Sequence, residues 1–146
     1  MFQWFHEYSL DVDFPIQKVW EFCLEPKNWP KWTEKFESCH CEGELKTGST
    51  IRVKIKTRFP QDIYMPIFIK EIQPYECKML LKVPFFAQEN VCTLQEISLQ
   101  KTRISVNTCV KSFFVPLMRS HFYKKIEKAK TKEFKRFLEV LEKELK

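Results

Sequence analysis

The sequence PLMRSHFYKKIEKAKTKEFKRFLEVLEKELK at residues 116–146 is the longest segment of the chain with the periodicity of one helix. Its apolar side chains recur at steps of three and four, which places them on one side of a helix. They are Phe122, Ile126, Ala129, Phe134, Phe137, Leu138, Leu141 and Leu145. A helix of about 28 residues is about 42 Å long. Its apolar stripe therefore needs an equally long surface among residues 1–115.

Those earlier residues predict two short helices and seven strands. Alternation over residues 4–12 indicates a first strand, and residues 15–25 and 26–32 indicate two short helices. From Phe36 onward the apolar residues recur every second position, as in strands, with short connectors between the segments. The strands predicted from this pattern are residues 36–42, 49–58, 62–72, 76–83, 88–99 and 103–113. The only two glycines, Gly43 and Gly48, lie in the first connector, where tight turns require positive φ.

Alternation within the strands predicts which side chains share a face. In the segment 49–58, Ile51, Val53 and Ile55 lie on one face and basic residues on the other. In the last segment, Ile104, Val106, Thr108 and Val110 oppose Arg103, Ser105, Asn107 and Lys111. Pro66 predicts a bulge or an edge.

We therefore expect one α+β domain spanning residues 1–146. Consecutive strands with short connectors form an antiparallel meander, and a twisted seven-stranded sheet curls. The expected fold is a curved antiparallel sheet wrapped around the long C-terminal helix, with the two short helices between the first and second strands. The apolar stripe of the long helix then lies on the concave face.

Charge and cysteine content limit the class of protein. The formal charge of +6 favours anionic partners. No apolar run approaches the ~20 residues that cross a bilayer, and the N-terminal sequence lacks the features of a secretory signal. The six cysteines are therefore expected to be reduced thiols in a cytoplasmic chain. Basic residues on the outer sheet face are interpreted as solvated, because few outward aromatics accompany them for base stacking, so nucleic acid is an unlikely partner.

The sequence offers few catalytic or metal-binding patterns. No Ser/His/Asp or Cys/His arrangement has a defensible spacing, and no cofactor is expected. In Cys39-His40-Cys41 the histidine points to the opposite strand face from the cysteines, so no metal site is expected. The three histidines are scattered. His121, near the start of the long helix, is a weak acid or base candidate.

Three connectors that contain phenylalanine and proline should lie at one end of the meander, because alternate connectors share an end. One follows the third strand, one follows the fifth strand, and one precedes the long helix. Their aromatic residues are Phe59, Phe85, Phe86, Phe113 and Phe114. One interpretation is that these rings close the end of the core. The other is that they frame the mouth of a cavity, gating an apolar ligand or touching a membrane surface, with nearby bases for phosphate headgroups.

Several segments resemble the START-like superfamily, the helix-grip group that includes polyketide cyclases and lipid-transfer domains. FPIQKVWEFCLEPKNWPKW at 14–32 is similar to the family's pattern around the two short helices. EGELKTGSTIRVKIK at 42–56 and IKEIQPYE at 69–76 resemble its first hairpin and the strand that follows. The resemblance implies an apolar cavity between sheet and helix that opens at the aromatic end.

Within such a cavity we expect inward sheet positions and the helix stripe to contact a ligand. These positions are Ile51, Val53, Ile55, Met65, Ile67, Met79, Leu81, Ile104, Val106, Phe122, Ile126 and Phe137. The leading hypothesis is sequestration or transfer of an apolar or amphipathic small molecule, such as a lipid, an isoprenoid or a polyketide-like compound. One alternative is an enzyme similar to polyketide cyclases or dehydratases that uses His121, Tyr123 or Asn107. A second is a protein-interaction module without a ligand. Polar side chains that converge in the cavity would favour the enzyme.

Overall fold

The computed structural model describes the backbone of residues 2–113 and 119–146, and the side chains of these residues except 2 and 119–123. The chain forms seven strands, two α-helices and one 3-10 helix, η1, in these described ranges. In chain order the elements are β1 (Phe2–Val12), α1 (Ile16–Cys23), η1 (Pro26–Lys31), β2 (Phe36–Cys41), β3 (Thr50–Ile55), β4 (Ile63–Gln73), β5 (Glu76–Val83), β6 (Phe86–Ser98), β7 (Lys101–Ser112) and α2 (Arg119–Leu145).

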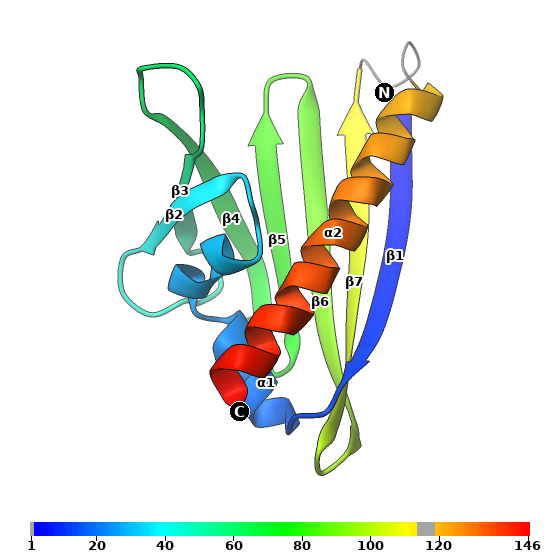
Figure 1. Ribbon diagram of the computed structural model, residues 1–146. Coiled ribbons are helices and arrows are strands. Elements are labelled where there is room, and N and C mark those ends of the chain that lie inside the picture. Colours follow the sequence, from blue (N-terminus) through cyan, green and yellow to red (C-terminus); the bar gives the residue numbers. More distant parts are fainter. Residues whose placement is uncertain (1, 114–118) are drawn as a thin grey trace.

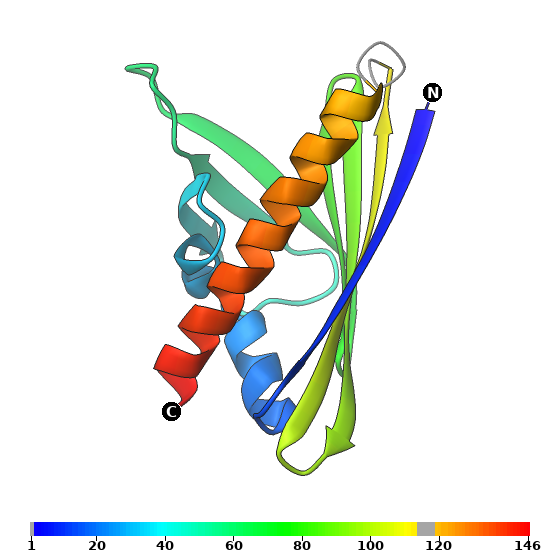
Figure 2. The same cartoon turned by 45° about the vertical axis from the view of Figure 1, so that its right-hand side comes forward.

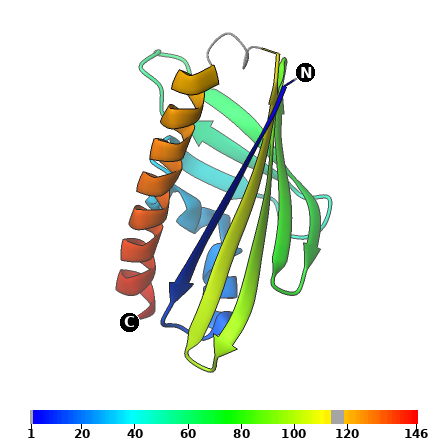
Figure 3. The same ribbon diagram turned by 90° about the vertical axis from the view of Figure 1, so that its right-hand side faces the viewer.

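All seven strands form one antiparallel sheet in the order β1-β7-β6-β5-β4-β3-β2. The meander runs from β2 to β7, and β1 joins it beside β7 (Figure 1). Helix α2 crosses one side of the curved sheet, and α1 and η1 lie near its C-terminal end (Figure 2). The view in Figure 3 shows that α2 and the short helices occupy the same side of the sheet. The α+β helix-grip architecture predicted from the sequence is confirmed.

The sequence predicted a bulge or an edge at Pro66, and in β4 this position has the one-sided pairing of an edge. The irregularity in this strand lies between Ile69 and Glu71, so a bulge at Pro66 is not what the chain forms. Pro66 faces Arg52 of β3, but the paired stretch with β5 begins only at Ile67. Position 66 thus has a strand neighbour on one side only. A missing N–H is tolerated where no ladder needs it.

The buried core lies mainly at the lower end of the molecule in Figure 1, where α1 and the C-terminal half of α2 meet the sheet. One apolar cluster joins Val19 and Phe22 of α1, Ile104 of β7, and Phe137 and Leu141 of α2. A second cluster covers β2 to β5 and is closed by Trp29 of η1. Outside these clusters, Lys31 forms a 2.9 Å ion pair with Glu144, which holds η1 to the end of α2.

The face that α2 turns to the sheet differs by one position from the predicted stripe. Ala129 is exposed, although the periodicity placed it on the apolar side. Lys130 is half-buried instead, as are Ile126 and Phe134 on either side of it. The reason is geometric: the helix is fixed by Phe137 and Leu141, which are 6% and 0% exposed. Position 130 projects in the same direction as these two residues, and position 129 does not.

Several basic residues on the outer face of the sheet form ion pairs with carboxylates. Lys54 contacts Glu37 at 3.2 Å and Asp62 at 3.5 Å, and Lys78 contacts Glu71 at 3.3 Å. The guanidinium of Arg52 lies 3.9 Å from the centre of the Tyr64 ring. The carboxylates in these ion pairs offset part of the positive charge that this face offers to a polyanion, whereas the neutral Tyr64 ring leaves the charge of Arg52 unchanged.

Candidate functional site

The candidate site is the part of the concave face that lies under the N-terminal half of α2, which we call the upper half. It consists of cross-strand rows of inward-facing residues, set by the pairing of β1 with β7, β7 with β6 and β6 with β5. The members on the four strands are Trp4, His6, Tyr8, Val106, Thr108, Val110, Gln88, Asn90, Cys92, Met79 and Leu81. Alternation along each strand brings them to the same face.

Polar side chains meet in the middle of this surface. His6, Thr108 and Asn90 are consecutive neighbours across β1, β7 and β6. The hydroxyl Oγ1 of Thr108 donates to Oδ1 of Asn90 at 2.8 Å, and Nε2 of Gln88 donates to the same oxygen at 3.4 Å. With its oxygen accepting twice, Asn90 keeps its amide N–H groups available to an acceptor on a ligand. We call His6, Gln88, Asn90 and Thr108 the polar row.

Aromatic rings border the polar row on the β1 side. The rings of Trp4 and His6 stack at 5.3 Å between centroids, and those of His6 and Tyr8 lie 6.1 Å apart. Tyr8 stacks on Phe134 of α2 at 4.0 Å. This last contact joins the sheet to the helix, and it marks the boundary between the upper half and the packed core below it.

The upper half is not part of either apolar core cluster. The first cluster takes its α2 members from residue 137 onward and the second has none, and neither cluster includes Tyr8, Phe134 or Ile126. His6, Gln88 and Asn90 are half-buried, and so are Met79, Leu81 and Val106, which only border the clusters. A surface that combines half-buried polar and apolar groups beneath a helix has the chemistry of a small-molecule site.

The cysteines in and beside this surface are poor nucleophiles. Burial raises the pKa of the Cys92 thiol to about 12 and that of Cys77 to about 11. Burial also raises the pKa of Cys23 well above its usual value. These thiols are therefore protonated at neutral pH, and the thiol form neither attacks substrates nor binds metals well. In the described ranges, no three His, Cys, Asp or Glu side chains are placed to hold a metal ion.

The predicted lining residues divide into two groups. Five of them are buried in the apolar clusters: Ile51, Val53, Ile67, Ile104 and Phe137. Six are half-buried on the concave side of the sheet or the facing side of α2: Ile55, Met65, Met79, Leu81, Val106 and Ile126. The side chain of Phe122 lies outside the described residues. Only the second group is placed to contact a ligand without disrupting the core.

Of the three predicted catalytic residues, the structure describes the side chain of Asn107. Asn107 is exposed on the convex face between Glu7 and Val91, so a role inside the site is wrong for it. Strand alternation requires this, because Val106 and Thr108 on either side face inward. The side chains of His121 and Tyr123 lie outside the described residues.

Sequence reasoning missed the polar row and Lys130, although part of the signal was readable. Thr108 was already assigned to the inward face of the last strand. The same period of two, counted back from Leu94, places Gln88, Asn90 and Cys92 inward on β6. Gln88 and Asn90 are polar, so hydropathy alone does not mark their positions as inward.

At the upper end of the sheet, two of the five predicted mouth residues contact each other. The rings of Phe85 and Phe113 form an edge-to-face pair at 5.8 Å, and the two residues are 60% and 53% exposed. Phe59 is 71% exposed on the β3–β4 loop, which rises at the same end (Figure 1). Phe86 is half-buried and lies beside Ser112 on the concave face. Phe114 lies outside the described residues.

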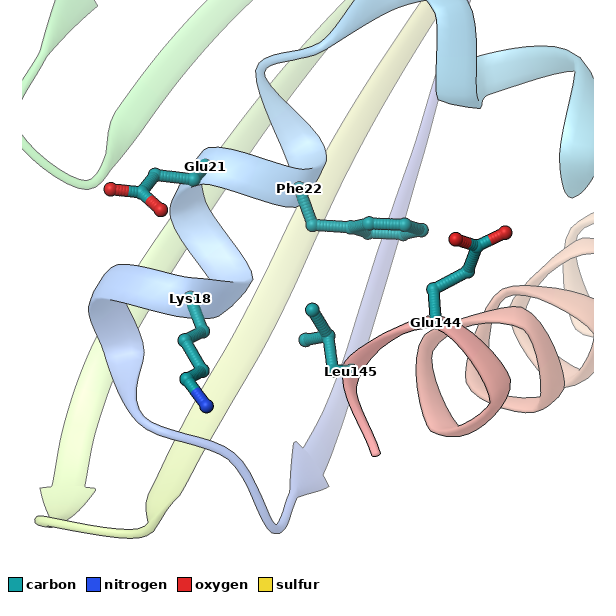
Figure 4. Close-up of a pocket in the computed structure, with 5 residues that line it drawn as sticks. All are labelled: Lys18, Glu21, Phe22, Glu144 and Leu145. Carbon is teal, nitrogen blue, oxygen red and sulfur yellow. The ribbon is translucent and has the colours of Figure 1, made fainter.

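Two surface hollows lie at the opposite end. One, of about 420 Å³, lies between α1 and the end of α2 and is lined by Lys18, Glu21, Phe22, Glu144 and Leu145. Figure 4 shows that Lys18 and Glu21 extend away from the Phe22 ring, so no polar groups converge there. The other, of about 340 Å³, lies beside the β4–β5 turn at Tyr75. Neither hollow includes a residue of the polar row.

No protein-family model and no curated protein matches this sequence. Solved structures do match its fold along nearly the whole chain. The Zhui aromatase/cyclase of Streptomyces sp. R1128 superposes with a TM-score of 0.78 at 10% identity, covering 99% of this chain and 97% of that one. A START superfamily protein of Mycobacterium smegmatis gives 0.72 at 13% identity, with coverages of 95% and 97%.

A third similar structure is a point mutant of norcoclaurine synthase from Thalictrum flavum in complex with a transition-state analogue. Its TM-score is 0.70 at 12% identity, covering 99% of this chain and 98% of that one. The chain therefore has the START-like, polyketide cyclase-like helix-grip fold. At these identities the likeness establishes the fold, and function has to be argued from the site. In the parts of the chain that the structure describes, no helix has the length and apolarity needed to span a membrane.

Proposed function

We propose that this protein binds an apolar or amphipathic small molecule between the upper half of the sheet and α2, for sequestration or transfer. The observation that carries the proposal is the composition of the upper half. Its polar row is surrounded by half-buried apolar and aromatic side chains, and it lies outside both core clusters. The apolar part of a ligand would contact Met79, Leu81 and Val106, and its polar group would reach Asn90.

Physical principles support a site in which apolar contacts provide affinity and polar groups orient the ligand. Apolar burial contributes about 25 cal/mol per Å² of area removed from water, without directional preference. Orientation then comes from a small number of placed hydrogen-bonding groups. Two of the similar folds have names that state enzymatic activities and one belongs to the START superfamily, so the scaffold is compatible with binding small molecules.

Titration with the neutral fluorophore N-phenyl-1-naphthylamine tests the proposal. The wild-type protein should bind the dye with saturable fluorescence enhancement. Val106→Trp places a large ring on the inward face between Tyr8 and Cys92, and it should raise the dissociation constant about tenfold or more. Absence of saturable binding to the wild type would refute the proposal.

The matched control is Asn107→Trp, the next residue of the same strand, whose side chain is exposed on the convex face. It adds the same ring to β7 outside the site, so the dissociation constant should stay at the wild-type value. Equal weakening by both variants would show that the dye binds elsewhere. Circular dichroism and urea unfolding of both variants check that the fold is kept.

A second candidate function is an enzyme that moves a proton in this site. The convergence of polar side chains favours it, and His6, whose ring stacks on that of Trp4 and lies 6.1 Å from that of Tyr8, is the candidate acid or base. Loss of turnover in His6→Gln with unchanged dye binding would distinguish this candidate from a carrier.

We further propose that the upper end contacts a membrane surface during ligand exchange. The exposed pair Phe85 and Phe113 lies beside the exposed bases Lys82 and Lys111. Aromatic and basic side chains together suit an anionic lipid interface. Phe85→Asp combined with Phe113→Asp should reduce sedimentation with phosphatidylserine vesicles and slow dye transfer from them. Leu99→Asp, 81% exposed at the opposite end, is the control and should change neither.

All six cysteines are free thiols in the structure. Cys77 and Cys92 face each other across β5 and β6 without forming a bond. Free thiols are usual in the reducing cytoplasm, and we propose that compartment for the chain.

A further inference from the structure

Lys130 occupies the centre of the α2 face that is turned to the sheet. Lys130 lies seven positions before Phe137 and eleven before Leu141, which are the buried residues of α2 among those with described side chains. With 3.6 residues per turn, Lys130 projects about 20° from each of them, one on either side. The side chain of Lys130 is half-buried, which agrees with this direction. The neighbouring Lys128, Ala129, Thr131 and Lys132 are all exposed.

The position of Lys130 along the helix brings it level with the polar row. Phe134 stacks on Tyr8, which fixes the height of α2 relative to β1 at that point. Both elements run from the upper to the lower end of the molecule (Figures 1 and 3). Lys130 lies four helical residues before Phe134, about 6 Å along the axis. His6 lies two strand residues before Tyr8, about 6.7 Å along β1.

No acidic side chain balances this ammonium group in the described part of the chain. The ion pairs found there involve Arg103 and other lysines, and none has Lys130 as a partner. The rows of the upper half contain no aspartate or glutamate. Glu133 is the half-buried acid nearest to Lys130 along α2. Its carboxylate accepts a hydrogen bond of 3.3 Å from Oγ1 of Thr33, which lies between η1 and β2. A lysine directed toward a half-buried surface is normally paired.

We infer that Lys130 is the binding group for the carboxylate of an acidic amphiphile, whose chain lies along the apolar residues of the upper half. The inference rests on the function proposed above and names the class of its ligand. A carboxylate accepts charge-assisted hydrogen bonds from an ammonium group, and its second oxygen can accept from the amide of Asn90. A neutral amphiphile of the same length would bind without the charge-assisted part.

Competition against N-phenyl-1-naphthylamine at pH 8 tests the inference with two ligands of equal chain length, dodecanoate and 1-dodecanol. In the wild type, dodecanoate should displace the dye at a concentration about tenfold lower than dodecanol, as expected for one charge-assisted hydrogen bond. Lys130→Met keeps an unbranched apolar stem of the same length as that of lysine and removes the ammonium group, and it should reduce the ratio to about one. Lys130→Arg should preserve a preference for the carboxylate.

Lys128→Met is the matched control, because it removes the same charge from the exposed side of the same helix. It should leave the ratio unchanged. If the wild type binds both ligands equally, the inference is wrong and the proposed function stands. If Lys128→Met lowers the ratio as much as Lys130→Met, the preference comes from the net charge of α2 and the inference is also wrong. Failure of the dye and both ligands to bind would overturn the proposed function itself.

Discussion

The two halves of α2 face the same sheet but differ in the side chains that they turn toward it. From Phe137 to Leu145 the inward residues are apolar and join a cluster with α1, β6 and β7. From Ile126 to Phe134 they include a lysine and face a polar row, and they join neither cluster. The helix period is continuous, so the difference comes from the side chains alone. A single element here provides stability at one end and a candidate binding surface at the other.

Truncation of one inward residue in each half should separate these roles most clearly. Leu141 is fully buried, and Leu141→Ala should lower the free energy of unfolding by about 2–5 kcal/mol, because it leaves a cavity in the core. Ile126→Ala removes a half-buried side chain and should cost less than about 1 kcal/mol. Urea unfolding followed by circular dichroism measures both. Equal losses would mean that the upper half is packed core and would contradict the comparison.

Two threonines on the inward face of β7 allow a finer test. Thr102 is fully buried in the lower half, and its hydroxyl donates to the carbonyl oxygen of Phe14 at 2.8 Å. Thr102→Val leaves that carbonyl without its donor and should cost about 1–3 kcal/mol of stability. Thr108→Val should cost about 0.5–1.5 kcal/mol, because the oxygen of Asn90 keeps its hydrogen bond from Gln88.

In ligand binding, Thr108→Val should have the larger effect of the two variants, whereas in stability Thr102→Val should. Thr108 belongs to the polar row, so Thr108→Val should weaken 1-dodecanol binding about two- to tenfold, the range for one neutral hydrogen bond. Thr102→Val should leave the dissociation constant unchanged. Competition with N-phenyl-1-naphthylamine provides the measurement. If Thr102→Val weakened dodecanol more than Thr108→Val, hydrogen bonding to the polar row would not contribute to binding.

The sequence predicted the strands and the layers well because both depend on local periodicity. The predicted segment 76–83 coincides with β5, and the long helix is placed within a few residues of α2. The site was predicted less well, since it depends on which inward residues remain outside the core. Ile51 and Val53 were indistinguishable by pattern from Met79 and Leu81, yet η1 brings Trp29 over the first pair. That packing is a tertiary contact, and alternation along a strand does not predict it.

Lys130 illustrates the same limit in the helix. Periodicity from Ile126 admitted either Ala129 or Lys130 as the next inward residue, and hydropathy favoured the alanine. The rotation of α2 is set by Phe137 and Leu141 against α1 and the sheet, several turns away. Once these two residues fix the rotation, the lysine faces inward, although it is polar.

The smallest expected effect concerns the convex side of the lower half, where β1 and β7 are joined by an exposed ion pair. Nε and Nη2 of Arg103 donate to the two carboxylate oxygens of Asp11 at 2.8 and 3.2 Å. The hydrogen bond from Arg103 holds the pKa of Asp11 below its usual value. A carboxylate whose folded-state pKa is lowered contributes stability above its unfolded pKa of about 3.9 and loses it as the pH falls through the folded value.

Arg103→Met should therefore lower the melting temperature slightly at pH 7, and the difference from wild type should shrink as the pH falls below about 4. Thermal unfolding of both proteins between pH 7 and pH 2 measures this. Gln3→Met, opposite Lys111 on the same face at the upper end of the β1–β7 ladder, is the control, and its difference from wild type should not vary with pH. A difference for Arg103→Met that stays constant down to pH 2 would mean that the arginine acts by packing its apolar stem on the strands, independently of the charge on Asp11.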